Sequence, residues 1–227
     1  MIFSILKYDL TIGKLIALLL LVVFGLMIAL VSRTLAQGVV AYKCGDGTPK
    51  AMGRLTLNPL THLDPLGFIC LILCGIGWSN TMPINPMNFK KYRSGIAWVS
   101  ISGILTNLVL CIIASFFYVL TLNTLGDSLN VIVIALYWFM YANAFLIAFN
   151  ILPIYPLDGF TFVSSFMKPD NKFVQGNIKY GTKILFGVLI VDIVLDLLFN
   201  FSIITYGLVW IADKICFPFC KLWSLMF

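Results

Sequence analysis

Apolar runs recur along this sequence and restrict what the chain can fold into. A transmembrane helix needs about 20 predominantly apolar residues, and runs suited to such helices occur at residues 15–40, 97–121, 129–150, 184–199 and 201–213. Of the 227 residues, 61% are hydrophobic and only 11% are charged, so a soluble domain could not cover its apolar surface with polar groups. The runs are too many for a signal peptide or a single anchor. The sequence therefore predicts an all-α, polytopic membrane protein with about five to six transmembrane helices.

A shorter apolar run covers residues 66–77, between the stretches "NPLTHLDPLG" and "GIGWSNTMPINPMNF". Both flanking stretches are rich in helix breakers, and the run is short for a span. Irregular backbone at membrane depth is tolerated only where protein or trapped water binds its polar groups. We therefore expect residues 44–93 to form an insertion on the cytoplasmic side, with a short or re-entrant helix. A full span at residues 66–77 is the alternative.

The distribution of lysine and arginine predicts the orientation in the membrane. If residues 66–77 do not cross, twelve of these residues fall on one side, and only Lys7 and Lys14 fall on the other. Cytoplasmic loops carry such an excess of positive charge. We therefore expect the N-terminus outside and the insertion, the 151–183 loop and the C-terminus in the cytoplasm. The twelve are Lys43, Lys50, Arg54, Lys90, Lys91, Arg93, Lys168, Lys172, Lys179, Lys183, Lys214 and Lys221.

The same pattern identifies the lipid bilayer, and not nucleic acid, as the partner that explains the net charge of +6. The basic residues lie in loops between apolar runs, and they do not form a patch with interleaved aromatic residues. Two cysteine pairs, Cys70 with Cys74 and Cys216 with Cys220, are each spaced four apart. No histidine neighbours them, so we interpret them as small apolar side chains on helix faces and not as a metal site.

One polar stretch stands out among the apolar runs: "NILPIYPLDG" at residues 150–159. It resembles the N-x-x-P-x-x-x-x-D-G signature of the site-2 proteases, a family of intramembrane zinc metalloproteases. Residues 40–67 ("VAYKCGDGTPKAMGRLTLNPLTHLDPLG"), 82–95 ("MPINPMNFKKYRSG") and 102–107 ("SGILTN") are similar to further segments of the family's compact bacterial branch, in the same order. In "SGILTN", Ile104 stands where the family usually has proline.

The resemblance implies a single site-2-protease-like membrane domain over residues 1–227, in a bacterial cytoplasmic membrane. In that family, the first core span carries H-E-x-x-H just before the segment that corresponds to "VAYK". The two histidines bind zinc, the glutamate activates the zinc-bound water, and the aspartate of the D-G motif is the third protein ligand. Here that third position is Asp158.

The five positions of that metal motif carry different residues in this chain: Arg33, Thr34, Leu35, Ala36 and Gln37. The chain has no glutamate and a single histidine, so no other register can supply the motif. Arginine offers no lone pair to a metal, and threonine is no general base near neutral pH. We therefore expect no intact catalytic residue, no zinc or other cofactor, and Asp158 as the one retained ligand position.

Arg33 is the residue that we expect to hold the carboxylate of Asp158. A buried cation and a buried carboxylate are each costly alone, and pairing removes most of that penalty. Gln37 or Thr34 would then satisfy the remaining hydrogen-bonding groups. In the alternative, Arg33 extends toward water and Asp158 caps the helix that follows it.

The resemblance also implies a groove for an unfolded peptide segment, built from the residues of the D-G motif. The alternative is a capped helix end followed by a turn, because asparagine and proline mark such ends. The two interpretations are compatible. The groove residues would be Asn150, Pro153, Pro156, Asp158 and Gly159.

Three further polar residues lie in apolar or loop surroundings. Asp192 and Asp196 are four apart and share a helix face, and intramembrane carboxylates are candidates for function. We favour a position near the outer interface, in a short hairpin with Asn200 and Ser202. His62 follows the family pattern, in which it is no zinc ligand, so we expect a hydrogen bond that organises the cytoplasmic loop.

These observations favour a catalytically inactive site-2-protease-like protein, which binds or scaffolds transmembrane segments of other proteins. One alternative is an active metalloprotease with unconventional ligands or ligands from a partner, which the metal content of the purified protein would distinguish. A second alternative is a small transport subunit that uses Asp158, Asp192 and Asp196. A flux assay in liposomes would identify it.

Overall fold

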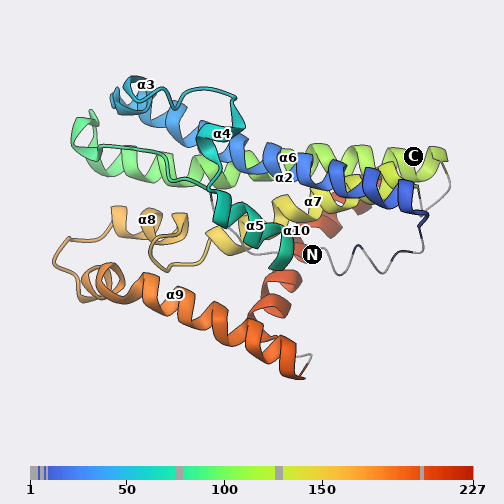
Figure 1. The fold of residues 1–227 in the computed structure, drawn as a ribbon. Helices are drawn as coiled ribbons and strands as arrows, with labels where there is room; N and C mark the ends of the chain where they lie inside the picture. Colours follow the sequence, from blue (N-terminus) through green and yellow to red (C-terminus); the bar gives the residue numbers. More distant parts are fainter. Residues whose placement is uncertain are drawn as a thin grey trace.

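The chain is helical throughout the part described by the computed structural model, residues 5, 8, 10–74, 79–125, 130–199 and 202–226. In these residues the β-structure is limited to one isolated antiparallel bridge between Leu63 and Ser79. Four helices are long and apolar enough to cross a membrane: α2 (Ile12–Cys44), α6 (Tyr92–Leu125), α7 (Val131–Asn150) and α10 (Ile203–Ser224). Figure 1 shows α2, α6 and α7 packed along one another. The predicted all-α polytopic class is confirmed.

Local sequence explains where these helices begin and end. The side chain of Asn130 accepts a hydrogen bond from the backbone N–H of Ile132 at 3.0 Å and so caps the start of α7. Helix α2 ends at Gly45, which has a φ of 115°, a left-handed conformation that favours glycine. The N–H of Gly45 bonds to the carbonyl of Tyr42, and that of Asp46 bonds to Ala41.

Small residues let the helices approach closely, as is usual where membrane helices meet. Between α6, α7 and α10 the buried cluster consists of Cys111, Ala114, Met140, Ala144, Ala212 and Cys216. Between α2 and α7, Gly25 lies against Phe139, and a Cβ at Gly25 would come within 3.0 Å of that ring. The core that positions the polar site is therefore a tight three-helix contact.

The insertion between α2 and α6 contains short helices, as expected. Helix α5 (Pro65–Cys74) has 10 residues, which rise about 15 Å, half of the roughly 30 Å hydrocarbon core. Its described part is therefore shorter than a span, which agrees with the predicted short or re-entrant helix. Residues 75–77 of the expected run lie outside the described residues. The other short elements are α3 (Thr48–Ala51), α4 (Pro59–His62) and the 3-10 turn η1 (Pro86–Asn88).

A buried carboxylate ties the two ends of this insertion together. Asp46 is fully buried, and its Oδ1 accepts hydrogen bonds from the backbone N–H and hydroxyl of Thr48 and from Nδ2 of Asn88. Its Oδ2 accepts from the backbone N–H of Asn85 at 2.7 Å. Burial alone would raise the pKa of Asp46, but the bonds from Thr48, Asn88 and Asn85 outweigh burial and hold that pKa below its usual value of 3.8.

The expected span at 184–199 lies in α9 (Lys172–Phe199), which is not among the four candidate spans. Its apolar half is interrupted by Asp192 and Asp196. The carboxylate of Asp192 is buried and accepts hydrogen bonds from the backbone N–H groups of Ile204 and Thr205 and from the Thr205 hydroxyl. Asp192 therefore caps the start of α10 from the neighbouring helix, as in the expected hairpin, of which Asn200 lies outside the described residues. The hairpin packs beside the end of α7, in the half of the bundle opposite the start of α2, and not on the outer side as expected. Asp196 is exposed.

Helix α10 runs in the same direction as α6. Near its start, Leu208 packs in one cluster with Ala148 and Phe149, at the end of α7. Near its end, Nε1 of Trp223 donates a hydrogen bond to Oγ of Ser115, in the second half of α6, at 3.0 Å. The end of α10 therefore points toward the half of the bundle in which α6 ends and α7 begins.

This direction corrects the expected topology. Helix α2 begins in that same half, packed on the start of α7. The ends of the helical chain therefore lie on one side, whereas opposite sides were expected. The expected span 201–213 was also too short: α10 continues to Ser224, so Lys214 and Lys221 lie in a helix and not in a cytoplasmic loop. The pattern failed because those two charges interrupt the apolar run.

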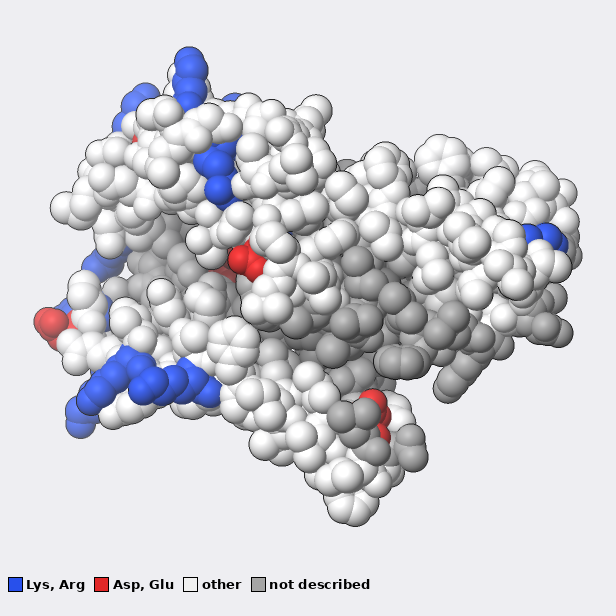
Figure 2. Space-filling model, viewed as in Figure 1, with Lys and Arg blue, Asp and Glu red and all other residues white. Residues whose placement is uncertain are grey.

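On the face that Figure 2 shows, most basic side chains lie at one end of the molecule. In Figure 2, the Lys and Arg side chains gather over the end that holds α3 and the start of α9, and most of the other half of this face lacks them. Ten of the twelve counted residues precede α10 in sequence. The charge asymmetry that was predicted from the sequence is therefore visible on the folded chain.

We predict that Asp46→Asn lowers the free energy of unfolding by about 1–3 kcal/mol, because the asparagine amide would face donors and leave them unsatisfied. The exposed Asp170→Asn is the matched control and should have little effect. The depressed pKa of Asp46 implies stability that is present above pH 3.8 and lost as the pH falls through the folded-state pKa. Denaturant unfolding in detergent should therefore show the gap between wild type and Asp46→Asn narrowing below about pH 4, and a gap independent of pH would contradict this explanation.

Candidate functional site

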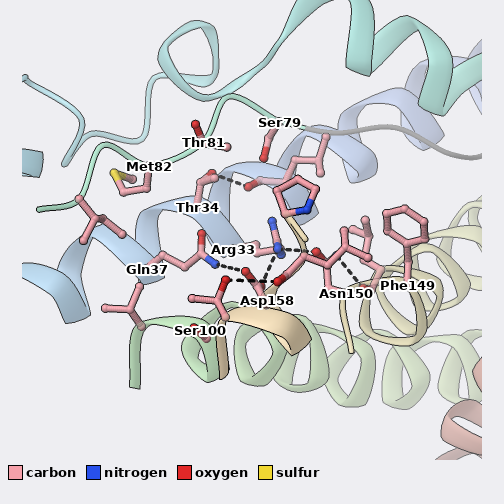
Figure 3. A pocket seen from close by; sticks show the side chains of 17 residues that line it. Arg33, Thr34, Gln37, Ser79, Thr81, Met82, Ser100, Phe149, Asn150 and Asp158 are labelled. Carbon is pink, nitrogen blue, oxygen red and sulfur yellow. Dashed lines mark hydrogen bonds and ion pairs between the residues drawn. The ribbon is translucent and has the colours of Figure 1, made fainter. Parts of the chain in front are cut away.

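The expected site lies in a cavity of about 240 Å³ between α2, α6, α7, the start of α8 (Asp158–Ser165) and the extended segment 79–84. Figure 3 shows Arg33, Thr34 and Gln37 reaching into it from α2, with Asp158 and Asn150 close to Arg33. Ser79, Thr81 and Met82 lie on another side of the cavity. The cavity therefore collects the degenerate motif positions, the D-G motif and part of the insertion.

A charge-assisted network occupies the centre of this cavity. Nη2 of Arg33 lies 2.6 Å from Oδ2 of Asp158 and donates a second hydrogen bond to Oδ1 of Asn150, also at 2.6 Å. Nε2 of Gln37 donates to the other carboxylate oxygen of Asp158 at 3.0 Å. The side chains of Arg33 and Asp158 are only 12% and 13% exposed. The predicted pair of Arg33 with Asp158 is confirmed, with Gln37 as the second donor.

The geometry of the pair has further features. The guanidinium contacts Asp158 through one nitrogen and not in bidentate fashion, because the same nitrogen also serves Asn150. Within the described residues, Nε of Arg33 is buried and has no hydrogen-bond partner. The hydroxyl of Thr34 bonds to the carbonyls of Leu30 and Val31 in its own helix and does not take part in the network.

Chain geometry explains why these residues meet. Arg33 and Gln37 are four apart on α2 and therefore share a helix face. Asn150 is the last residue of α7, and Asp158 is the first residue of α8. Gly159 packs so closely behind Asp158 that a Cβ there would overlap the backbone carbonyl of Ile151. The short 151–157 loop thus places the amide of Asn150 and the carboxylate of Asp158 against the guanidinium of Arg33.

Gly103 on α6 is a site residue that the sequence did not single out. A Cβ there would lie 3.0 Å from Nε2 of Gln37, 3.1 Å from Cγ of Arg33 and 3.2 Å from Oδ2 of Asp158. Only a residue without a side chain leaves room for the network at this point. Its place in "SGILTN", a stretch that resembles the family, was the available signal.

The extended segment 79–84 is the second element that the sequence did not place. The backbone N–H of Asn80 donates to the carbonyl of His62 at 2.8 Å, and Nδ2 of Asn80 donates to the carbonyl of Leu63. Arg54 donates to the carbonyls of Asn80 and Thr81. These bonds hold the segment over the cavity.

His62, whose carbonyl accepts the hydrogen bond from Asn80, is itself held in place through its side chain. The imidazole is fully buried, and its Nε2 lies 2.7 Å from the carbonyl oxygen of Thr56. Since a carbonyl only accepts, Nε2 carries the proton. The expected loop-organising hydrogen bond of His62 is confirmed.

The residues expected to form the groove divide into two sets. Asn150, Pro156 and Asp158 line the cavity, whereas Pro153 and Gly159 do not. Pro153 is exposed on the loop, and Gly159 is buried behind the aspartate. The cavity is therefore bounded by Pro156 on one side and by segment 79–84 on the other.

The donor set of this cavity does not suit zinc. Arg33 has no lone pair, Thr34 is turned to its own backbone, and both oxygens of Asp158 accept hydrogen bonds. Among the described residues, no three His, Cys, Asp or Glu side chains are close enough to hold a metal ion. A catalytic zinc site usually offers three protein ligands, and here one is present at most.

Four candidate spans and a polar site at the end of α7 and the start of α8 define a polytopic membrane protein with a polar cavity between its helices. The chain is similar to a protein of Bacillus subtilis (strain 168) named "Putative zinc metalloprotease YwhC", with 39% identity over 152 residues, which are 65% of this chain and 69% of that protein. The chain therefore belongs to the site-2-protease-like family of membrane proteins. No family model matches the sequence, and no solved structure matches it.

We predict strongly non-additive losses of stability at the central pair. Arg33→Met and Asp158→Asn should each lower the free energy of unfolding by roughly 3–5 kcal/mol, because each change leaves an uncompensated buried group. The double variant should lose less than the sum of the two single losses. Thermal or denaturant unfolding of all four proteins measures the cycle.

The matched control is the exposed Arg93→Met with the exposed Asp170→Asn, which should add within about 0.5 kcal/mol. Strict additivity at Arg33 and Asp158 would show that the contact contributes nothing to the stability of the fold.

We also predict that the triple change Arg33→His, Thr34→Glu, Gln37→His creates a zinc site. Positions 33 and 37 already direct their side chains at Asp158, so two imidazoles would complete a set of three ligands. Metal analysis of the triple variant should find roughly one zinc per chain. Addition of Asp158→Asn is the control and should lower that content, and a folded triple variant without zinc would contradict the inferred geometry.

Proposed function

We propose that this chain is a pseudoprotease of the site-2-protease-like family, which binds or scaffolds transmembrane segments of other proteins without cleaving them. The observation that carries the proposal is the contact of 2.6 Å between Nη2 of Arg33 and Oδ2 of Asp158. A permanent cation stands where the family's metal would stand, and it already neutralises the family's third ligand. Asp158, the one retained ligand position, is therefore already paired with a cation instead of a catalytic metal ion.

The partner segment would bind as an extended peptide along residues 79–84. Within the described residues, the backbone N–H groups of Met82 and Ile84 donate no hydrogen bond. Such free backbone groups can add a strand from a partner, with side chains held in alternate pockets. The adjacent cavity, lined by Leu30, Leu146 and Phe149 as well as by polar residues, would take one apolar side chain of that segment.

We place the protein in a bacterial cytoplasmic membrane, with the insertion and the start of α9 on the cytoplasmic side. The basic end in Figure 2 supports this orientation, because cytoplasmic loops carry excess Lys and Arg. The start of α2 is then outside. The end of α10 lies in that same outer half, contrary to the position expected from the sequence.

The two other candidate functions have less support. A transport role would need mobile intramembrane carboxylates, but Asp158 is paired and Asp192 caps α10. An active protease completed by a partner would have to displace Arg33 from Asp158. Neither candidate has an observation in its favour.

Photo-crosslinking in native membranes tests the proposal. A photoreactive amino acid at the exposed, cavity-lining Thr81 should capture membrane-anchored segments of other proteins, uncleaved. The matched control is Ile113, which is 47% exposed on α6 outside the cavity.

Adducts at Thr81 should exceed those at Ile113 and should diminish when a soluble extended peptide competes. Equal labelling at both positions would contradict the proposed peptide-binding groove. Cleavage of the captured segment that depends on Asp158 would show an active protease and overturn the pseudoprotease.

A further inference from the structure

Two opposite charges on α10 lie where a membrane protein can least tolerate them. Asp213 and Lys214 are adjacent and exposed, and both lie within a candidate membrane span. The hydroxyl of Tyr141 donates to Oδ1 of Asp213 at 2.6 Å. Tyr141 is 10 residues after Val131 and 9 before Asn150, so it lies about 15 Å from either end of α7. The carboxylate is therefore at mid-depth of the bundle.

Neither charge is neutralised inside the described part of the chain. Asp213 has Tyr141 as its hydrogen-bond partner there, and its Oδ2 accepts nothing. Nζ of Lys214 lies 5.6 Å from the centroid of the Trp210 ring and makes no ion pair. Lysine can extend toward water, but the short aspartate side chain cannot. Exposed, unpaired charges at this depth are expensive and indicate a partner.

Helix α10 also presents an uncovered apolar line beside these charges. Only 17% of its most apolar 18-residue window is buried, against 33% for α2 and α6 and 44% for α7. With about 100° between successive residues, Trp210 and Phe217 both project between Asp213 and Lys214. Their side chains are 62% and 68% exposed. The helix thus carries an aromatic seam flanked by one negative and one positive side chain.

This arrangement is self-complementary. Two copies in one membrane have the same orientation, so a two-fold axis along the membrane normal would bring two α10 helices together in parallel. The aromatic seams then face each other, and the residues flanking the seam on one helix meet the opposite flank of the other. Asp213 of each copy meets Lys214 of its partner at nearly the same depth, and the pairing occurs twice.

We propose that the protein forms a symmetric homodimer through α10, with two intermolecular Asp213–Lys214 ion pairs at mid-membrane. A second copy fits better than another partner because the chain itself supplies both charges, at the right depth and on the right flanks. Tyr141 orients the carboxylate by occupying Oδ1, which leaves Oδ2 for the lysine. The pocket at Asp158 is not part of this interface, so the inference does not depend on the proposed function.

Charge exchange between copies tests the dimer. The full chain is labelled in two colours, reconstituted in liposomes over a range of protein-to-lipid ratios, and assayed for energy transfer. Wild type should associate. Asp213→Lys alone and Lys214→Asp alone should each associate about tenfold more weakly, because like charges then face each other.

A mixture of the Asp213→Lys and Lys214→Asp proteins should recover association, because each copy supplies the charges that the other lacks. Recovery cannot come from misfolded protein. The control exchanges charges of the same types on α9, Lys183→Asp and Asp196→Lys, both at exposed positions, and should leave association unchanged.

A neutral variant keeps the test valid if the charge-reversed proteins fail to fold. Asp213→Asn with Lys214→Met should melt as a folded protein and associate more weakly than wild type. Wild-type association by this neutral variant would overturn the proposal, as would a wild type that stays monomeric at every ratio. Association with a different membrane protein, without self-association, would assign the charges to another partner and also overturn it.

Discussion

The carboxylate of Asp158 is only 13% exposed between helices that otherwise bury apolar side chains, and its charge has to be neutralised there. Arg33 supplies the cation, Gln37 supplies a second donor, and Asn150 shares the guanidinium. The second half of α2, the end of α7 and the start of α8 are therefore held at one point. The same contact bears on the chemistry, because the guanidinium of Arg33 already neutralises the carboxylate that a metal ion would need as a ligand. The local fold and the proposed function both depend on this ion pair.

Much of this site could be predicted from the sequence. The spacing of Arg33 and Gln37 places both on one helix face, and the D-G motif identifies Asp158, so the pairing follows from the cost of two isolated buried charges. Because the chain has a single histidine and no glutamate, the sequence alone excludes the metal motif. Such a pairing can be predicted from the sequence because few side chains can neutralise a buried carboxylate.

Other parts of the site and the fold depend on contacts between distant segments. Segment 79–84 has no periodic pattern, and its position follows from hydrogen bonds with His62, Leu63 and Arg54. Gly103 matters only because three polar side chains pack against it. The direction of α10 was predicted wrongly because residues 184–199 were counted as a span, whereas α9 is not among the four candidate spans. The helix continues past Lys214 to Ser224, with Asp213 hydrogen-bonded to Tyr141 and Trp223 hydrogen-bonded to Ser115.

The zinc content of the wild-type chain tests the central claim most directly. The full-length protein would be purified from membranes of cells grown with added zinc, and the metal would be quantified beside the Asp158→Asn variant. An arginine-neutralised site predicts zinc far below one atom per chain, with no difference between the two proteins. Roughly one zinc per wild-type chain, lost on Asp158→Asn, would contradict the account and restore Asp158 as a metal ligand.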